Sequence, residues 1–244
     1  MTEGVLLIHA FPLDARMWDP QIAVLDGVPV VAPHLPGFGG TSGAGDVMSM
    51  ASAAERCLEA MDAAGVDRAV VCGLSMGGYV AFELWRRARE RFAGLILANT
   101  RAGADTEEGA AGRRALAARL LAEGNGFLVE SPPPLLSDHA SDELWRRVRG
   151  LIAAQPAASI AAAALGMAER PDSTPDLATI DVPTLVVTAD GDTLIPAAAT
   201  SPMADQIPGA DLAVIDGAGH LSNLEASDAF DELLAHHLER CFPA

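Results

Sequence analysis

The sequence predicts an α/β fold in which a mostly or wholly parallel sheet of six strands is flanked by helices and carries a helical cap. Six short apolar runs, several of them rich in β-branched residues, are spread over the 244 residues. Most are separated by stretches in which apolar residues recur at helical spacing, and strands that alternate with helices form a parallel sheet covered on both faces. Residues 101–176 interrupt the alternation, because they contain no convincing strand.

The first four runs fall within residues 1–100, and each is short and almost wholly apolar, as is typical of a strand buried on both faces. A loop rich in glycine and proline, 34–41, separates the second run from a helix of about residues 47–64, and another helix precedes the fourth run and ends near Arg91. The expected strands are 5–8, 28–32, 68–72 and 95–98.

The second half begins with residues 101–176, which hold helical stretches rich in glycine, alanine and arginine. We expect this segment to be a cap inserted after the fourth strand, over the carboxyl edge of the sheet. Residues 1–100 and 177–244 would then form the core. The alternation resumes with a strand at 184–189, a helix near 197–207, a strand at 212–215 and a closing helix of about 225–240.

Composition indicates which classes of partner are disfavoured and in which cellular compartment the protein is expected. The 33 acidic and 16 basic residues give a net charge of −17, which disfavours nucleic acids and anionic membranes because both are polyanions. Three widely spaced cysteines, without a CxxC pair, suit a reducing compartment better than a disulfide framework. No run is long enough to span a membrane, and the first apolar run stops at His9 and Pro12, without the features of a signal peptide. We therefore expect a cytoplasmic protein.

The chemistry centres on the motif Gly73-Leu74-Ser75-Met76-Gly77, which follows an apolar strand and precedes a helix. In this context Gly-x-Ser-x-Gly predicts a nucleophile elbow, a sharp turn that exposes the serine hydroxyl. Gly73 and Gly77 have no Cβ, so the strand and the helix can approach closely. A glycine-rich turn with an incidental serine is the alternative that the rest of the chain has to exclude.

A serine hydroxyl needs a base within hydrogen-bond reach and a third group that orients the base. Functional groups of open parallel sheets collect beyond the carboxyl ends of the strands, and His220 follows the sixth strand there. We expect Asp192 to be the orienting acid, because it lies further out in its loop than Asp190. Asp190 and Asp216 remain alternatives. The chain order serine, aspartate, histidine is the one expected for a nucleophile elbow on a parallel sheet.

The oxyanion that forms during attack needs two hydrogen-bond donors. We expect one to be the Met76 N–H, at the N-terminus of the helix that follows Ser75. The other is expected from the loop after the first strand, where Phe11 can donate and Pro12 has no N–H. We assign His9, in the same loop, a structural role.

Together these residues resemble α/β-hydrolases of the capped esterase, enol-lactonase and cofactor-free haloperoxidase group. The resemblance implies the acyl-transfer roles given above and a site without metal or organic cofactor. Ala10 and Ala189 replace glycines usual in this group, and an antiparallel hairpin usually precedes the first strand seen here. The matching segments are 9–14, 35–39, 73–78, 192–196 and 217–225.

We therefore expect an enzyme that cleaves a small-molecule carboxylic ester or lactone, as a monomer or homodimer. The alternatives are a perhydrolase or acyltransferase, a carbon–carbon bond hydrolase, and a ligand-binding receptor with vestigial hydrolysis. Arg170 is expected to form a local salt bridge rather than to hold a substrate carboxylate, and Arg113 to be solvated. The expected substrate contacts are Phe11, Leu128, Trp145, Leu194 and Leu221.

Overall fold

Six strands form one sheet in the computed structural model, which describes residues 1–43 and 45–242. The strand order is β2-β1-β3-β4-β5-β6, and every neighbouring pair is parallel. This confirms the predicted α/β class and the wholly parallel sheet. The strands are β1 Glu3–Ile8, β2 Val30–Val31, β3 Arg68–Leu74, β4 Phe92–Ala98, β5 Thr184–Ala189 and β6 Asp211–Ile215.

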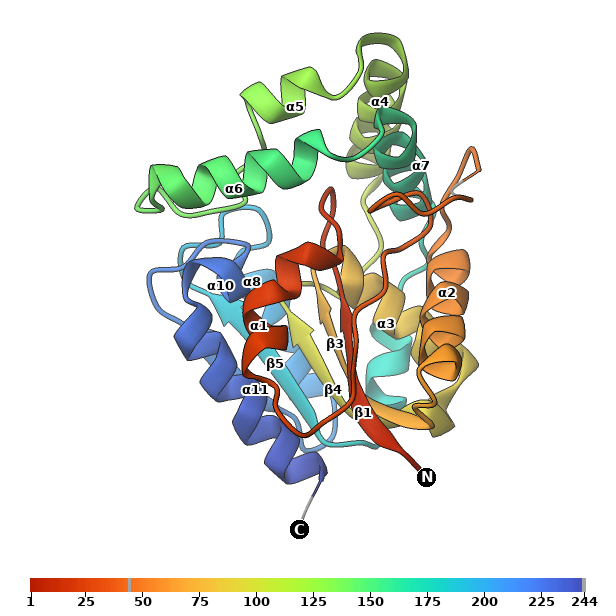
Figure 1. The fold of residues 1–244 in the computed structure, drawn as a ribbon, viewed down its shortest axis with the longest axis vertical. Coiled ribbons are helices and arrows are strands. Elements are labelled where there is room, and N and C mark those ends of the chain that lie inside the picture. Colours follow the sequence, from red (N-terminus) through yellow and green to blue (C-terminus); the bar gives the residue numbers. More distant parts are fainter. Residues whose placement is uncertain (44, 243–244) are drawn as a thin grey trace.

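Helices cover both faces of the sheet (Figure 1). One face carries α2 (Met50–Ala63) and α3 (Met76–Arg87), which contact each other and β1, and the other face carries α1 (Asp19–Val24) and α11 (Ser227–Cys241). The central strands β3, β4 and β5 are almost entirely buried, whereas Leu212 and Val214 of the edge strand β6 are exposed. Double coverage thus explains why the central strands are continuous apolar runs.

Helix α2 shows how the sequence pattern sets local structure. The Ser49 hydroxyl caps the helix by accepting the Ser52 N–H at 3.0 Å, as N-cap serines do. Its buried residues recur at helical spacing and form the stripe that faces the sheet. They are Met50, Ala53, Ala54, Cys57 and Met61.

Residues 101–176, which we call the helical insertion, lie over the carboxyl ends of the strands (Figure 1). Helix α4 packs against α7, and the Gly166 Cα lies so close to the Met48 carbonyl oxygen that a Cβ would clash with it. The insertion is therefore seated on the core. Its elements are α4 Glu107–Glu123, α5 Gly126–Glu130, α6 Asp142–Ala153, α7 Ala157–Ala168 and the 3₁₀ helix η3 Thr174–Thr179.

Some elements differ from the prediction. The helix expected near 197–207 is two short helices, α8 (Ala197–Thr200) and α9 (Pro202–Gln206), because Pro202 has no N–H to continue a helix but suits the first position of a new one. The closing helix is preceded by a separate turn of helix, α10 (Ser222–Glu225). The 3₁₀ helix η1 (Ala15–Trp18), the turn η2 (Arg89–Arg91) and α1 were not predicted as separate elements.

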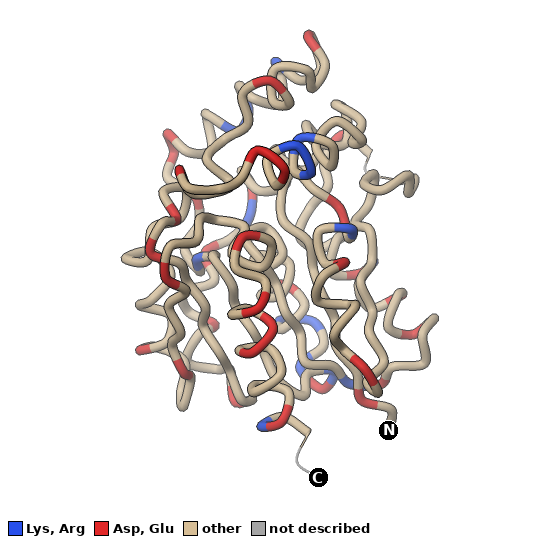
Figure 2. The backbone as a smooth tube through the Cα atoms, turned by 60° about the vertical axis from the view of Figure 1, so that its left-hand side comes forward, with Lys and Arg blue, Asp and Glu red and all other residues tan. Residues whose placement is uncertain are grey.

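Among the described residues, no single helix has the length and apolarity needed to cross a membrane. Helices α6 and α7 reach those limits only when taken together, and their axes differ by 92° at the break between them. Acidic positions are scattered along the whole chain, in the core and in the helical insertion alike (Figure 2), so the negative net charge is not confined to one face.

Candidate active site

Ser75 forms the turn between β3 and α3 with an unusual backbone conformation, φ 57° and ψ −115°. Such a conformation is unfavourable for a residue with a side chain and is retained where the surroundings hold it. The Ser75 N–H donates to the Ala98 carbonyl at 2.9 Å, and the Ser75 carbonyl accepts the Gly78 N–H at 2.9 Å and the Thr100 hydroxyl at 2.8 Å. Backbone and side-chain hydrogen bonds therefore fix the strained turn.

The glycines around Ser75 allow β1, β3 and α3 to meet. A Cβ on Gly73 would lie within 3.0 Å of the Gly77 carbonyl oxygen, and a Cβ on Gly77 would lie within 3.0 Å of the Ile8 carbonyl oxygen. Both obstacles are backbone atoms, which cannot move aside as a flexible side chain can. The glycines thus serve close approach, as the sequence indicated.

A buried, hydrogen-bonded pair of an imidazole and a carboxylate lies beyond β5 and β6. The His220 Nδ1 is 2.8 Å from Asp192 Oδ2, and both side chains are buried. Asp192 Oδ2 also accepts the Asn99 side-chain amide at 2.9 Å, while its Oδ1 accepts the backbone N–H groups of Leu194 at 2.9 Å and Ile195 at 2.8 Å. Four donors therefore satisfy the carboxylate and fix its orientation.

The other two acids considered from the sequence point elsewhere. Asp190 is exposed and accepts the Gly217 N–H at 2.6 Å, and Asp216 is exposed as well. Only Asp192 is hydrogen-bonded to His220 among the described residues. Asp192 is thus the acid that this geometry favours.

Hydrogen bonds determine the protonation of the pair. Burial alone would raise the pKa of Asp192. The hydrogen bond and charge of His220, together with the Ile195 N–H and the Asn99 amide, outweigh burial. They hold the pKa of the carboxyl below its ordinary value. Because the ionised Asp192 accepts at Nδ1, the neutral imidazole carries its proton there. The lone pair lies on Nε2, which is buried and has no hydrogen-bond partner among the described residues.

A polar network joins the serine turn to this pair. Thr100 donates to the Ser75 carbonyl, and its neighbour Asn99, at φ 45°, donates to Asp192. The side-chain Oδ1 of Asn99 in turn accepts the hydroxyl of Ser222, two residues after His220, at 2.6 Å. Sequence reasoning missed Asn99 and Thr100, although two polar residues directly after an apolar strand are a usable signal.

The histidine loop is also held against the helical insertion. The Leu221 N–H donates to the Leu135 carbonyl at 2.8 Å. The Glu225 carboxylate accepts the N–H groups of Ser137 at 2.9 Å and Gly219 at 2.8 Å, and the Ser137 hydroxyl as well. His220 therefore sits between two residues whose backbone N–H groups are both fixed.

The two expected oxyanion donors lie just beyond the carboxyl ends of two neighbouring strands, β1 and β3. Met76 is the first residue of α3, where an N–H has no intrahelical acceptor. Phe11 follows β1, which pairs with β3 next to Ser75. Strand β2 lies on one side of β1, whereas β3 and the later strands lie on the other, so the connections change direction between β1 and β3. Open α/β sheets bind ligands at such a switch point.

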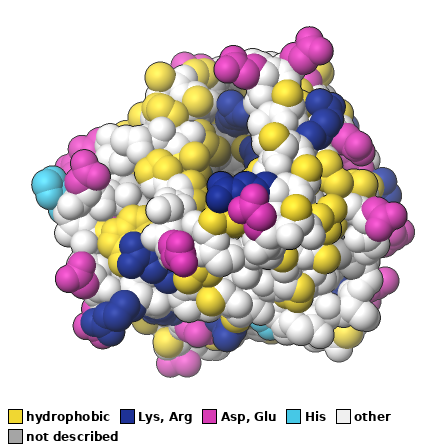
Figure 3. Space-filling model, turned by 90° about the horizontal axis from the view of Figure 1, so that it is seen from above, with side chains coloured by type: hydrophobic (Ala, Val, Ile, Leu, Met, Phe, Trp, Pro, Cys, Tyr) yellow, Lys and Arg dark blue, Asp and Glu magenta, His cyan; other side chains and the backbone are white. Residues whose placement is uncertain are grey.

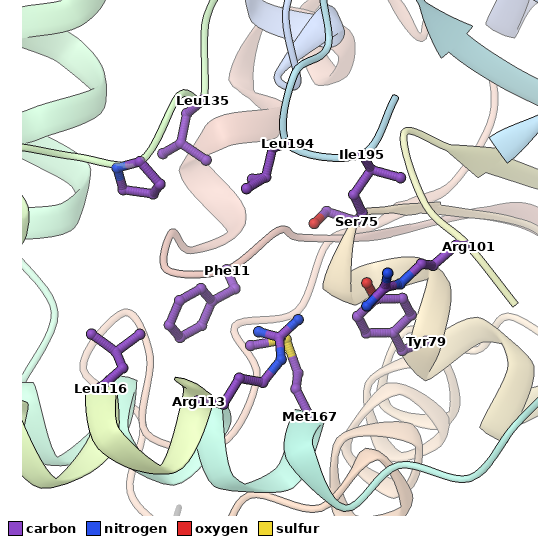
Figure 4. Close-up of a pocket in the computed structure, with 11 residues that line it drawn as sticks. Phe11, Ser75, Tyr79, Arg101, Arg113, Leu116, Leu135, Met167, Leu194 and Ile195 are labelled. Atoms are coloured by element: carbon purple, nitrogen blue, oxygen red, sulfur yellow. The ribbon is translucent and has the colours of Figure 1, made fainter. Parts of the chain in front are cut away.

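A cavity of about 230 Å³ opens at Ser75 beneath the helical insertion. Figure 4 shows Phe11 and Leu116 on the side of the cavity opposite Tyr79 and Arg101. From the side of the insertion the surface is hollowed, with hydrophobic and basic side chains around the hollow (Figure 3). The lining residues are Phe11, Ser75, Tyr79, Arg101, Arg113, Leu116, Pro133, Leu135, Met167, Leu194 and Ile195.

Three expected substrate contacts do not line this cavity, whereas Phe11 and Leu194 do. Leu128 and Leu221 are buried in the apolar core, and Trp145 packs partly against that core with the Arg149 guanidinium over its ring. The correction has a physical cause, because hydrophobicity shows that a side chain is buried but not on which side of the insertion it lies.

The arginines need a second correction. Arg113, expected to be solvated, lines the cavity, and so does Arg101. Arg170 behaves as expected and forms a local salt bridge with Asp105 at 2.9 Å. Among the described residues, no group of three or more His, Cys, Asp or Glu side chains is arranged to hold a metal ion.

His9 is buried and structural, and it makes the stability depend on pH. Its Nε2 accepts the Leu35 N–H at 3.1 Å, so Nδ1 carries the proton that the Ala10 carbonyl accepts. Burial lowers the pKa of His9 to about 4. The unfolded chain, with a pKa near 6.5, thus binds more protons between these values, and stability falls as the pH drops through this window.

We expect the His9 contribution to the free energy of unfolding to fall by about 2 kcal/mol between about pH 7.5 and about pH 5. The pKa of His237 is also lowered to about 4, so the wild type loses more than this. The measurement is urea unfolding at both pH values for wild type and His9→Gln, whose amide oxygen can still accept the Leu35 N–H. An equal pH dependence in the two proteins would contradict the assignment.

Comparison with known proteins places these features in context. Residues 5–233 match the Alpha/beta hydrolase family. The chain is 28% identical to 3-oxoadipate enol-lactonase 1 of Acinetobacter baylyi, over 95% of this chain and 87% of that protein. Among solved structures, a malate-bound thermophilic esterase from Thermogutta terrifontis is 39% identical with a TM-score of 0.93, covering 99% of this chain and 90% of that one. The enol-lactonase from Burkholderia xenovorans LB400 is 26% identical with a TM-score of 0.87, covering 98% and 92%.

Proposed function

This chain belongs to the alpha/beta hydrolase family and is a hydrolytic enzyme, and from that premise we propose that it cleaves a carboxylic ester or lactone through an acyl-enzyme. The observation that carries the proposal is the buried Asp192–His220 pair, 2.8 Å apart, whose His220 Nε2 has no hydrogen-bond partner in the part of the chain that the structure describes. A strained serine turn is tied to that pair by Asn99 and Thr100 and lines a cavity. The esterase and the enol-lactonases among its relatives support an ester or lactone substrate.

In the first half-reaction, His220 Nε2 takes the proton from the Ser75 hydroxyl as its oxygen attacks the substrate carbonyl. Ionised Asp192 keeps the Nδ1–H tautomer and stabilises the imidazolium that forms. Catalytic hydrogen bonds are often long in the free enzyme and shorten with substrate. The imidazolium then gives its proton to the leaving alkoxide, which departs as the alcohol.

The N–H groups of Phe11 and Met76 stabilise the tetrahedral oxyanion in both half-reactions. Removing one such donor commonly lowers kcat by about 10²- to 10³-fold. In the second half-reaction His220 deprotonates a water molecule, which attacks the acyl-enzyme, and Ser75 regains its proton as the acid is released.

We also propose that residues 101–176 act as a cap on a core of residues 1–100 and 177–244. Five cavity-lining residues come from this segment beyond Arg101, which supports the proposal. They are Arg113, Leu116, Pro133, Leu135 and Met167.

The test is covalent labelling with a fluorophosphonate, which reacts with an activated serine. We expect one label per chain, found by peptide mass spectrometry on Ser75, and a burst of acyl-enzyme with a p-nitrophenyl ester. The exposed Ser42 serves as the internal control and should stay unmodified. Labelling of Ser42 and Ser75 to a similar low extent would mean that Ser75 is not activated, and the proposed mechanism would be wrong.

A further inference from the structure

Three arginines surround one buried carboxylate beside the cavity. Asp105, whose side chain is 2% exposed, accepts hydrogen bonds from Arg101 and Arg113 and pairs with Arg170 Nη1 at 2.9 Å. Asp105 precedes α4, Arg113 lies on α4, Arg101 follows β4, and Arg170 follows α7. The cluster therefore joins the helical insertion to the exit of β4.

The charges of this cluster do not balance. Burial opposes the ionisation of Asp105, but the hydrogen bonds and charges of Arg113 and Arg170 outweigh it and hold the pKa of Asp105 below its ordinary value. One negative charge thus faces three guanidinium groups, which always carry their charge. An excess of positive charge at a partly buried site is costly unless an anion compensates it.

A purely structural role requires only one of these arginines. Arg170 is 3% exposed, donates to the carbonyls of Met167 and Gly103 at 2.9 Å, and lies over the Tyr79 ring at 4.0 Å. These contacts already fasten the end of α7 to the core. Arg101 and Arg113 add two further positive charges to a carboxylate that Arg170 alone would neutralise.

Those two arginines are the ones that reach the cavity. Figure 4 shows the guanidinium groups of Arg101 and Arg113 directed toward the space near Ser75. The Arg101 Nε finds no acceptor among the described residues, and the Arg113 Nη1 lies 3.4 Å from the Met167 sulfur, a weak acceptor. Asp105 therefore does not use all the N–H groups of either side chain, although the Arg101 Nε itself is buried.

Building on the proposed ester or lactone hydrolysis, we propose that Arg101 and Arg113 form an anion subsite, and that the substrate carries a free carboxylate besides the ester or lactone carbonyl. Arginine forks suit carboxylates because they can donate two parallel hydrogen bonds. The apolar side chains of Phe11 and Leu116, opposite Arg101, contact the uncharged part of the substrate.

The helix sets the approximate spacing between the two ends of the substrate. Tyr79 lies beside Arg101 in the cavity and four residues after Ser75 on α3, which corresponds to a rise of about 6 Å. A chain of a few carbon atoms between the reacting carbonyl and the free carboxylate spans such a distance. Half-esters of glutaric and adipic acid are the matching probes.

The experiment compares monomethyl with dimethyl glutarate, and monomethyl with dimethyl adipate, by pH-stat titration. Within each pair the acyl chain is the same, and only the free carboxylate is replaced by a methyl ester. In at least one of the two pairs, we expect the wild-type kcat/KM per ester group to be at least tenfold higher for the monomethyl ester than for the dimethyl ester. Arg101→Gln and Arg113→Gln should each lower this ratio at least fivefold, whereas Arg114→Gln, at an exposed neighbouring position, should leave it within twofold.

A second measurement does not depend on turnover. Glutarate or adipate should slow fluorophosphonate labelling of Ser75 in the wild type and in Arg114→Gln, and have at least fivefold less effect in Arg113→Gln. Circular dichroism melting checks that each variant is folded, and Arg101→Gln offers an independent variant if Arg113→Gln is not.

Equal kcat/KM values for the monomethyl and dimethyl esters, or a ratio unchanged in both arginine variants, would overturn the anion subsite. Absence of methyl ester cleavage by an enzyme that is labelled at Ser75 would overturn it as well. In these cases the proposed serine hydrolysis stands, because labelling of Ser75 tests it separately. Failure of the label to react would instead contradict the proposed function itself.

Discussion

Ser75→Ala is expected to lower kcat for a p-nitrophenyl ester by about 10⁶-fold, because no other group can form the acyl-enzyme. A small rate above the uncatalysed reaction should remain, since the oxyanion donors and the cavity are untouched. Stability should change little, because the Ala98, Gly78 and Thr100 hydrogen bonds to residue 75 involve only its backbone. The measurement is steady-state hydrolysis together with the melting temperature of wild type and variant.

Ser42→Ala is the matched control, because it removes the same hydroxyl from an exposed loop, and its kcat should equal that of the wild type. If Ser75→Ala retained more than about one hundredth of the wild-type kcat, the covalent mechanism would be contradicted. If the wild type and Ser75→Ala both bound the reaction product and neither hydrolysed the ester, the receptor alternative would be favoured instead.

The parts of the site that the sequence predicts are those whose reasons are local. The strand, serine turn and helix around Ser75 need glycine at positions 73 and 77, because a Cβ there would meet the backbone of Gly77 or Ile8. The glycines are therefore visible in the sequence before any tertiary contact is known. The buried strands are predictable for a similar reason, since coverage on both faces requires continuous apolar runs.

The parts that the sequence does not predict depend on the direction of a side chain. Leu128 and Arg113 both lie in the helical insertion, and their residue types indicate a cavity wall for the leucine and solvent for the arginine. The structure places them the other way round, with Leu128 in the core and Arg113 at the cavity. Helix packing decides this, and it depends on contacts between α4, α7 and the core that no local pattern encodes.

The choice among Asp190, Asp192 and Asp216 is an intermediate case. Their positions in the sequence place all three near strand ends, and only a preference for the outer loop position favours Asp192. The geometry adds what the sequence lacks, namely four donors on Asp192 and exposure of the other two. The sequence could therefore rank Asp192 first but had no means of excluding the alternatives, and the geometry favours the same residue.

Asp192→Asn is expected to lower kcat about 10⁴-fold at neutral pH. The backbone N–H groups of Leu194 and Ile195 require an acceptor at Oδ1, so the amide oxygen of the asparagine takes that position. Its NH₂ group then faces His220 Nδ1 and can only donate to it. The imidazole is forced into the Nε2–H tautomer, which cannot accept the Ser75 proton, and the charge that stabilises the imidazolium is lost.

The measurement is kcat and the rate of fluorophosphonate labelling, which should fall together because both need deprotonation of Ser75. Asp190→Asn is the matched control, because Asp190 lies in the same loop and its carboxylate accepts the Gly217 N–H, a bond that an amide oxygen can accept as well. It should keep kcat within about twofold. A large loss in Asp190→Asn with near wild-type activity in Asp192→Asn would reverse the assignment, and equal small losses in both would mean that His220 does not act as the base through a fixed tautomer.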